Sequence, residues 1–372
     1  MVTALLGMVR RPFGGPLWLV AGVLTLIAGL VSGTATSVSA SFRTAIGLAL
    51  LVALLPYVMR FLREFHSRSL YIGVWGFVSV QTASALAGLA QSYLGIEVAG
   101  NMARDGRANG LAGHPNVLAL MSTVVIVVLA WALSRVHRLA SRVVILAVIV
   151  VNFLALIASG SLSALLVLAV GLVALLLLSP AMWKVFVGLV CLIFVVTVVA
   201  AFLGVDLTAL FDDTQARVLD VTGQGDGVAS WEIRQATWAE GWARIQLSPI
   251  IGWGMDGTNQ AVYGSVVVHD MLIRAWYQGG IVLFVVFLII TGLVLASMFW
   301  RGLGPLKPVA VGVMLLVWTF ALTSAFYNEI HYWMLIGLAV GVLDVPRPLR
   351  RAGDRISGRA PAPRGLSSSV TA

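Results

Sequence analysis

The stretch "GGIVLFVVFLIITGLVLASMFW" (residues 279–300) contains no charged side chain in 22 positions. As an α-helix it would be about 33 Å long, enough to cross a hydrocarbon layer roughly 30 Å thick. Similar apolar runs recur through the 372-residue chain, in which 60% of the residues are apolar and 10% are charged. Soluble globular domains do not have this composition, so the sequence predicts an integral membrane protein.

The spacing of these runs predicts ten membrane spans and an all-α, polytopic helical fold, because an isolated helix satisfies its own backbone in lipid. The predicted spans are residues 16–32, 44–59, 70–95, 113–134, 143–159, 162–179, 183–204, 279–300, 308–327 and 331–345. Seven spans therefore fall within residues 1–204, and three fall within 279–345.

The positive charges orient the spans, since Lys and Arg accumulate in short cytoplasmic loops. With both termini in the cytoplasm, 17 of the 24 basic residues lie inside, and 12 of the 15 acidic residues lie outside. The net charge of +9 thus follows from topology, and it does not indicate nucleic-acid binding. The Arg-, Pro- and Gly-rich residues 346–372 are predicted to be a disordered basic cytoplasmic tail near the lipid headgroups.

Two further features bound the interpretation. Arg10 and Arg11 precede an apolar stretch that ends near "SVSA" (37–40), so a cleaved secretory signal is an alternative to the first span. Cys191 is the single cysteine, which leaves no disulfide framework and no Cys-based metal site.

Residues 205–278 form the predicted large extracytoplasmic loop, which is too long for a simple connector. Within it, "SWEIRQATWAEGWARIQLSP" reads as a helix with Ser230 as its N-cap. Its stripe of Trp231, Trp238, Trp242 and Ile245 predicts an interfacial helix with its rings at headgroup level. Arg234 lies at the edge of this stripe, where it either snorkels to water or meets an anion.

The loop returns to the membrane at "VVHDMLIRAWYQGG" (267–280). His269 is the side chain there that is best suited to exchange a proton near neutral pH, and the plainer alternative is a helix cap. Asp270 and Arg274 are four residues apart, so they can equally form a helix ion pair.

A second outer region lies before the fourth span. His114 and Asn116 open that helix, and Arg107 lies with Arg104 in the Gly-rich loop just before it. A helix N-terminus flanked by arginines can hold a phosphate, although a cap and solvated charges explain the same residues. Glu329 and His331 are most simply a polar hairpin.

These outer regions together suit the binding of a lipid pyrophosphate and the deprotonation of a hydroxyl, and they contain no metal-ligand cluster. The order of four motifs then resembles the O-antigen ligase and O-antigen polymerase family of membrane glycosyltransferases over roughly residues 70–345. The motifs are "GLAGHPNVLALM" (110–121), "SGSLSALLVLAVGLVALLLL" (159–178), "IRQATWAEGWARIQLSPIIGWGMDG" (233–257) and "VHDMLIRAWYQGGIVLFVVFLI" (268–289).

The resemblance implies inverting, metal-independent transfer of a glycan from an undecaprenyl-pyrophosphate donor to a glycan or glycolipid hydroxyl, without a cofactor. It is expected to occur on the outer side of the cytoplasmic membrane, where the loop caps a lipid-accessible cavity. His269 is then the candidate base or orienting group, and Arg234 is the candidate pyrophosphate ligand. The candidate substrate-binding residues are Arg217, Arg274, Arg107, Asp270, Asn116 and His114.

The chain departs from the family pattern at three positions. Leu162 stands where the family has an arginine, Asp270 stands where Asn is usual, and Gln278 stands where Glu is common. Arg217, Arg107 or Arg274 are the alternatives for supplying the missing charge. A transporter or flippase for a lipid-linked saccharide is the competing function, and a receptor or scaffold is a third.

Overall fold

The computed structural model describes residues 10–103, 106–188, 190, 230–256, 261–263, 266–324 and 329–343. Its helices are α2 (Gly15–Gly33), α3 (Val38–Ala49), η1 (Leu50–Leu54), α4 (Leu55–Phe65), α5 (Ser67–Leu94), η2 (Gly110–Ala112), α6 (Pro115–Leu133), α7 (Leu139–Ala158), α8 (Leu162–Leu178), α11 (Ser230–Leu247), α12 (Met271–Phe299), α13 (Lys307–Ala321) and α14 (Ile330–Val342). Two short strands, β1 (Ala261–Tyr263) and β2 (Val266–Val267), pair antiparallel. The predicted all-α polytopic class is confirmed.

Six helical segments of the described chain are long and apolar enough to cross a membrane: α2, the continuous α3–η1–α4 segment, α5, α6, α7 and α12. The helices α8, α13 and α14 are shorter but also apolar. These nine segments match nine of the ten predicted spans. Most of the seventh predicted span, 183–204, lies outside the described residues.

The outer surface of the bundle is suited to lipid. On α2, Val20, Val23, Ile27 and Leu30 are all exposed, whereas Trp18 is fully buried. This spacing of three and four residues puts the exposed side chains on one helical face. A row of exposed aliphatic side chains is unfavourable in water and is the expected surface of a helix in hydrocarbon.

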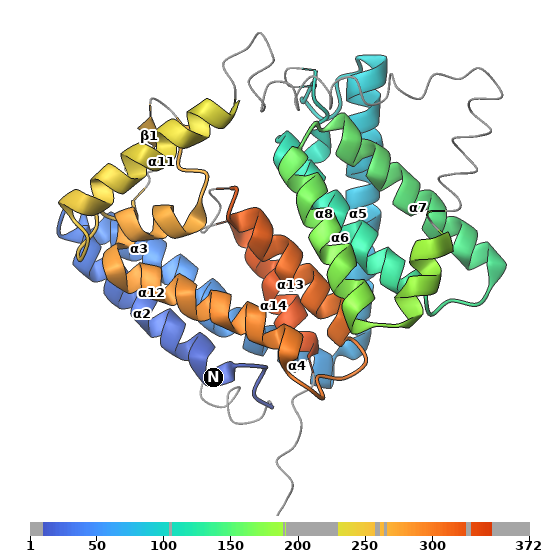
Figure 1. Cartoon of the computed structure of the whole chain (residues 1–372), viewed down its shortest axis with the longest axis horizontal. Helices are drawn as coiled ribbons and strands as arrows, with labels where there is room; N and C mark the ends of the chain where they lie inside the picture. Colours follow the sequence, from blue (N-terminus) through green and yellow to red (C-terminus); the bar gives the residue numbers. More distant parts are fainter. Residues whose placement is uncertain are drawn as a thin grey trace, which may run out of the picture.

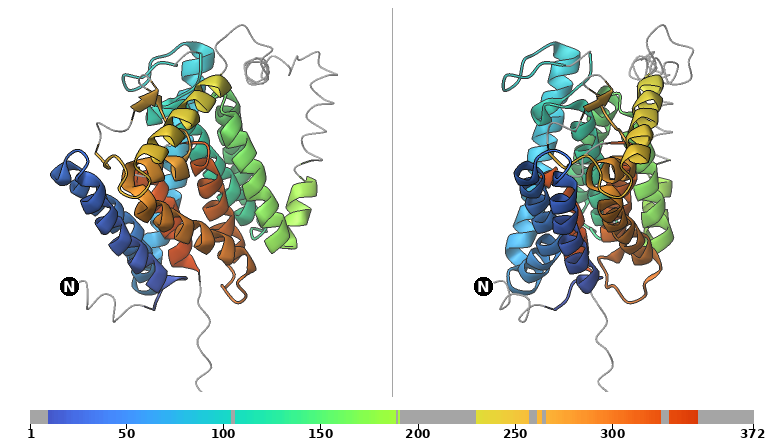
Figure 2. Two further views of the ribbon diagram at one scale, coloured as in Figure 1. Left: turned by 60° about the vertical axis from the view of Figure 1, so that its left-hand side comes forward. Right: turned by 90° about the vertical axis from the view of Figure 1, so that its left-hand side faces the viewer.

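The helices form three neighbouring groups (Figures 1 and 2). Helix α2 packs on α3 and α12, and α5, α6 and α7 pack together with α8 beside α6. Helices α13 and α14 pack on each other and lie between these groups. Helix α13 contacts α12 on one side and α8 on the other, and α14 packs on α4. Helix α11 packs on α12 at the end of the bundle away from α4.

Small residues allow close approach where α2 meets α3. A Cβ atom added to Gly29 would lie 2.2 Å from the Cβ of Ala45, and one added to Gly22 would lie 2.5 Å from the Cβ of Ala53. Membrane helices use such small-residue contacts because lipid provides no hydrophobic drive for their association. The absence of side chains at Gly22 and Gly29 therefore lets the first two spans approach each other closely.

The second span contains a π-helical turn, η1, in its middle. Pro56 follows it in the first turn of α4. A proline inside a helix lacks a donor N–H and its ring meets the carbonyl four residues earlier, so the wider turn accommodates Pro56 without ending the span.

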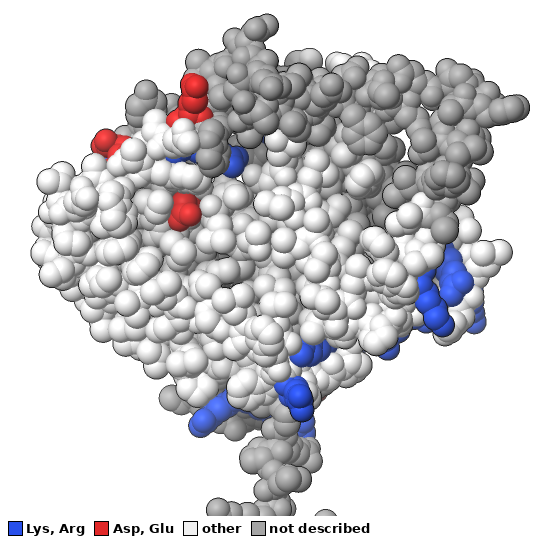
Figure 3. All heavy atoms as spheres, viewed as in Figure 1, with Lys and Arg blue, Asp and Glu red and all other residues white. Residues whose placement is uncertain are grey.

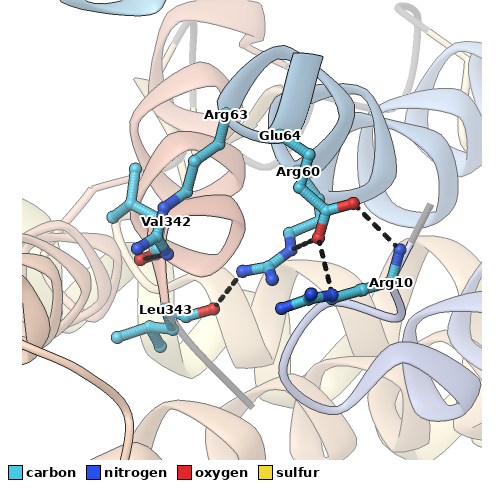
Figure 4. Close-up of polar contacts among 6 residues, drawn as sticks. All are labelled: Arg10, Arg60, Arg63, Glu64, Val342 and Leu343. Atoms are coloured by element: carbon cyan, nitrogen blue, oxygen red, sulfur yellow. Dashed lines mark hydrogen bonds and ion pairs between the residues drawn. The ribbon is translucent and has the colours of Figure 1, made fainter. Parts of the chain in front are cut away.

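At the end of the bundle opposite α11, two arginines of α4 hold the C-terminus of α14 (Figure 4). Arg60 is 2% exposed, donates from Nη1 to the carbonyl of Leu343 at 2.7 Å, and pairs through Nε with Glu64 at 2.8 Å. Arg63 donates to the carbonyl of Val342. These contacts satisfy carbonyls that a helix end leaves without partners.

Candidate active site

The segment that brings the chain back to the bundle ends at the first turn of α12. Asp270 is the N-cap of α12, and its side chain accepts a hydrogen bond from the backbone N–H of Ile273 at 2.9 Å. His269, directly before it, is half-buried. The cap considered for His269 is thus formed by Asp270 instead, and it fixes the position of the neighbouring imidazole at the helix start.

Burial raises the pKa of the Asp270 carboxyl, and hydrogen bonds from the backbone of Ile273 and Leu272 oppose this effect. An ionised carboxylate is disfavoured when water is removed from it. Asp270 therefore performs a capping role at an electrostatic cost that an asparagine would not carry.

Helix α12 begins earlier than the predicted span 279–300, because residues 271–279 are already helical. The helix is interrupted at Gly280, whose φ of 65° and ψ of −167° are non-helical. The predicted span begins at Gly279, whereas Gly280 marks a break between residues 271–279 (the outer segment) and the longer apolar segment that follows.

The turn that follows α11 fills this break. Trp253 N–H donates to the carbonyl of Tyr277 at 2.8 Å, and Gly254 N–H donates to the carbonyl of Gln278 at 2.9 Å. The N–H of Ile281 in turn donates to the carbonyl of Ile250 at 3.3 Å. Backbone groups that lose their helical partners at the break thereby gain new ones, as buried backbone requires.

The same turn is anchored to the first two helices. The N–H of Met255 donates to Ser41 Oγ at 2.9 Å, and Asp256, which is 4% exposed, accepts from Thr36 Oγ1 at 2.8 Å. Asp256 was not among the predicted site residues. Its position after a Gly-rich turn was the available signal, but its partner lies 220 positions away in sequence.

Arg274 and Gln278 lie on the inner face of the outer α12 segment. Arg274 is 2% exposed and Gln278 is fully buried, and Arg274 Nε donates to Gln278 Oε1 at 3.2 Å. A buried guanidinium needs an acceptor, and the glutamine found where Glu is common supplies a neutral one. The charge of Arg274 is therefore held inside the protein.

Helix α11 crosses the outer end of α12 and extends toward the outer ends of the helices coloured green in Figure 2 (left). Gly241 marks the contact with α12, because a Cβ added there would lie 2.9 Å from Ile273 and 3.0 Å from Val268. Arg234 is seven residues earlier, so it shares this face of α11 about 10 Å farther along the axis. The face that packs beside His269 thus also presents Arg234.

The part of the tryptophan stripe of α11 that the structure describes packs in part against α12. Ile245 is 2% exposed and packs with Val268 and Tyr277, and Trp238 is partly buried against this cluster. Trp242 is 48% exposed and meets the ring of Trp276 edge-on at 5.8 Å. The stripe serves mainly to seat α11 on α12, because the outer segment of α12, absent from the prediction, offers an apolar surface.

Arg234 itself is half-buried and reaches the start of α8. Its Nη1 donates to Ser163 Oγ at 3.5 Å, and burial lowers the pKa of the guanidinium. A lowered pKa here reflects lost hydration of a group that stays protonated at neutral pH. The arginine is thus a desolvated cation at a helix N-terminus.

The second predicted region reaches the same turn from the other side. Arg107 donates from Nε to the carbonyl of Ser159 at 2.7 Å and from Nη2 to Asn116 Oδ1 at 2.9 Å. His114 is the N-cap of α6, since its Nδ1 accepts from the N–H of Asn116 at 3.2 Å. The cap interpretation is correct for His114, which is exposed.

The structure therefore groups the predicted residues into two sets. Arg107, Asn116 and Arg234 surround the turn between α7 and α8, and His269 and Asp270 lie at the start of α12 under α11. Arg217 and Arg104 lie outside the described residues. At the tip of α14, His331 Nδ1 lies 4.0 Å from Glu329 Oε2, which agrees with the polar-hairpin interpretation.

A comparison with curated proteins gives no match. Residues 147–288 match the model of a family described as O-antigen ligase. The match runs from α7 through the start of α8 and α11 to the membrane-spanning part of α12, and it includes residues 159–163, Arg234 and His269. The resemblance inferred from the motifs is thereby confirmed over residues 147–288.

Proposed function

We propose that this multi-pass membrane protein transfers a glycan from an undecaprenyl-pyrophosphate donor to a sugar hydroxyl on the outer side of the cytoplasmic membrane. The match to the O-antigen ligase family supports a membrane glycan-transfer role in O-antigen assembly. The observation that carries the finer proposal is α11, which joins Arg234 at the α8 N-terminus to the segment holding His269. A lipid pyrophosphate stays at the headgroup plane, so its ligands belong at such an outer helix end.

In the proposed reaction, His269 accepts the proton of the acceptor hydroxyl as its oxygen attacks the anomeric carbon of the donor sugar. The bond from that carbon to the pyrophosphate oxygen breaks, and undecaprenyl pyrophosphate leaves with the bonding electrons. Attack opposite the leaving group inverts the anomeric centre. The imidazolium then returns its proton to water, which completes the cycle without a metal ion.

Arg234 is assigned to the leaving group. The pyrophosphate gains negative charge as the bond breaks, and a guanidinium already in place stabilises that charge without reorganisation. Its planar fork can donate two hydrogen bonds to phosphate oxygens. The α8 N-terminus contributes in the same direction through its partial positive charge.

Asp270 and Arg274 are assigned supporting roles. Asp270 fixes the first turn of α12 and thereby the backbone of His269, and Arg274 holds the outer segment through Gln278. Neither assignment requires contact with the donor. Asn116 and His114 are assigned supporting roles too, Asn116 by holding Arg107 and His114 by capping α6.

The test is reconstitution of the purified protein in liposomes with an undecaprenyl-pyrophosphate-linked glycan and a glycan acceptor. We expect Arg234→Ala to lower turnover by roughly 10²- to 10³-fold, as for the loss of one preorganised electrostatic donor. We expect His269→Ala to lower turnover as well, because the acceptor hydroxyl then loses its proton acceptor. Arg244→Ala is the matched control, because Arg244 lies on the same helix and pairs with the partly exposed Glu240 at 3.4 Å.

Release of undecaprenyl pyrophosphate that persists undiminished in both variants would rule out the site. Movement of intact lipid-linked glycan between leaflets, without cleavage of the sugar–phosphate bond, would favour a flippase.

A further inference from the structure

The turn between α7 and α8 is approached by two arginines that are far apart in sequence. Arg107 Nε donates to the carbonyl of Ser159 at 2.7 Å, and Arg234 Nη1 donates to Ser163 Oγ at 3.5 Å. Ser159 lies in this three-residue turn and Ser163 lies in the first turn of α8, so the two guanidinium groups contact positions that are four residues apart in one short segment. Each is half-buried.

This turn is also the positive end of a helix. Helix α8 has 17 residues, and its N-cap, Ser161, makes no side-chain hydrogen bond to the first turn. A helix N-terminus carries a partial positive charge from its unsatisfied N–H groups. Two guanidinium groups therefore approach a third positive feature, an arrangement that an anion stabilises.

Leu162 lies at the centre of this arrangement. It is the first residue of α8, it is half-exposed, and it stands where the family resemblance expects an arginine. The missing charge thus belongs to the same turn that Arg107 contacts.

Of the other two alternatives, Arg274 is less suited to replace it. Arg274 is buried in the outer segment of α12 and bonded to Gln278. Arg217 lies outside the described residues. Arg107 is in contact with the turn and is held there by Asn116 Oδ1 at 2.9 Å.

We infer that Arg107 replaces the arginine missing at position 162 and, with Arg234, binds the donor pyrophosphate, one guanidinium to each phosphate. This inference rests on the proposed function. A diphosphate diester carries one negative charge on each phosphate at neutral pH, which matches two cations that contact one short segment.

The test relocates the charge. In the reconstituted full chain, we expect Arg107→Ala to weaken binding of the undecaprenyl-pyrophosphate-linked glycan by about 10- to 100-fold, the usual cost of losing hydrogen bonds to a charged group. Adding Leu162→Arg to that variant should recover most of the lost binding and turnover. Adding Leu162→Gln, which is polar but uncharged, is the matched control and should recover neither.

A purely structural role for Arg107 predicts a different result. Arg107→Ala would then lower the melting temperature, and Leu162→Arg would restore neither folding nor donor binding, which would overturn the inference. Undiminished donor binding by Arg107→Ala would overturn it as well. Failure of the proposed function is separate, because the wild-type protein would then release no undecaprenyl pyrophosphate.

Discussion

At the residue scale, Asp270 has two opposing effects on the stability of the folded protein. Its carboxylate caps α12 through the N–H of Ile273, which stabilises the helix start beside His269. Burial raises the pKa of the same carboxyl, so the charged form is held at a cost. An asparagine side chain can accept the same hydrogen bond without this cost.

The pH dependence of stability follows from the raised pKa. Between the unfolded value near 3.8 and the higher folded value, the native state binds more protons than the unfolded state, so the free energy of unfolding falls as the pH rises. We expect Asp270→Asn to remove this fall and to leave the protein at least as stable at pH 7. Thermal unfolding in detergent between pH 4 and pH 7 measures the effect.

Asp270→Ala is the comparison variant. It removes both the charge and the cap, so we expect it to be less stable than Asp270→Asn by about 1 kcal/mol at pH 7. Equal stability of the two variants would mean that the hydrogen bond to Ile273 contributes nothing.

Sequence reasoning at this scale selected the charged residues but not their contacts. Arg107, Arg234 and His269 were recognisable because a titratable or cationic side chain beside an apolar helix is unusual. Ser159 and Ser163 carry no such signal, since a serine is unremarkable at a helix end. Their importance depends on contacts with residues 52 and 71 positions away, respectively.

The break in α12 governs the site at the scale of elements. The interruption at Gly280 lets residues 271–279 form a separate outer segment that carries Asp270, Arg274 and Gln278. The turn at 250–254 fits only because glycine is present at the crossing: a Cβ at Gly280 would lie 2.0 Å from the carbonyl oxygen of Ile250. The glycines of the two motifs therefore belong to one packing contact.

We expect Gly280→Ala to destabilise the protein strongly and to abolish glycan transfer. Its φ of 65° is strained for a residue with a side chain, and the added methyl group would collide with backbone that cannot rotate away. Gly292→Ala is the matched control in the same helix, since a Cβ there meets nothing within 4 Å and alanine favours the helix. Gly280→Ala should have a lower melting temperature and a lower turnover than Gly292→Ala. Equal values for the two variants would contradict the proposal that the break at Gly280 shapes the site.

Element boundaries show where sequence reasoning reaches its limit. The apolar runs placed α2 and the other described spans correctly, because bilayer thickness fixes their length. The predicted span left out the outer segment of α12 because Arg274 and Gln278 are polar and interrupt the apolar run. Only their packing inside the protein, against each other, makes them part of a helix.

At the scale of the whole molecule, charge separates the two ends of the bundle. In Figure 3 the Asp and Glu side chains gather near α11, whereas most Lys and Arg side chains in view gather at the opposite end. The basic end is also where Arg60 and Arg63 hold the last turn of α14. The sequence predicted this separation from loop composition, but it did not predict that α4 and α14, far apart in the chain, meet there.

The separation leads to a prediction about orientation. Because positive charge is retained in the cytoplasm, we expect the end that carries α11 and the loop after α5 to face outward. Cys191 is the single cysteine, so a Cys191→Ser background allows one thiol to be placed at a time. Glu97 follows α5 and His137 precedes α7, and both are exposed. The predicted topology puts these two residues on opposite sides of the membrane.

In intact spheroplasts, a membrane-impermeant maleimide should label Glu97→Cys and should label His137→Cys only after the membrane is opened with detergent. The two variants control for each other, because both thiols should react after permeabilisation and only one should react before it. If only His137→Cys were labelled before permeabilisation, the protein would have the opposite orientation in the membrane. Arg234 and His269 would then face the cytoplasm. They would meet nucleotide-activated sugars there, and not the assembled glycan that has been translocated to the outer side. The proposed reaction could therefore not occur at this site.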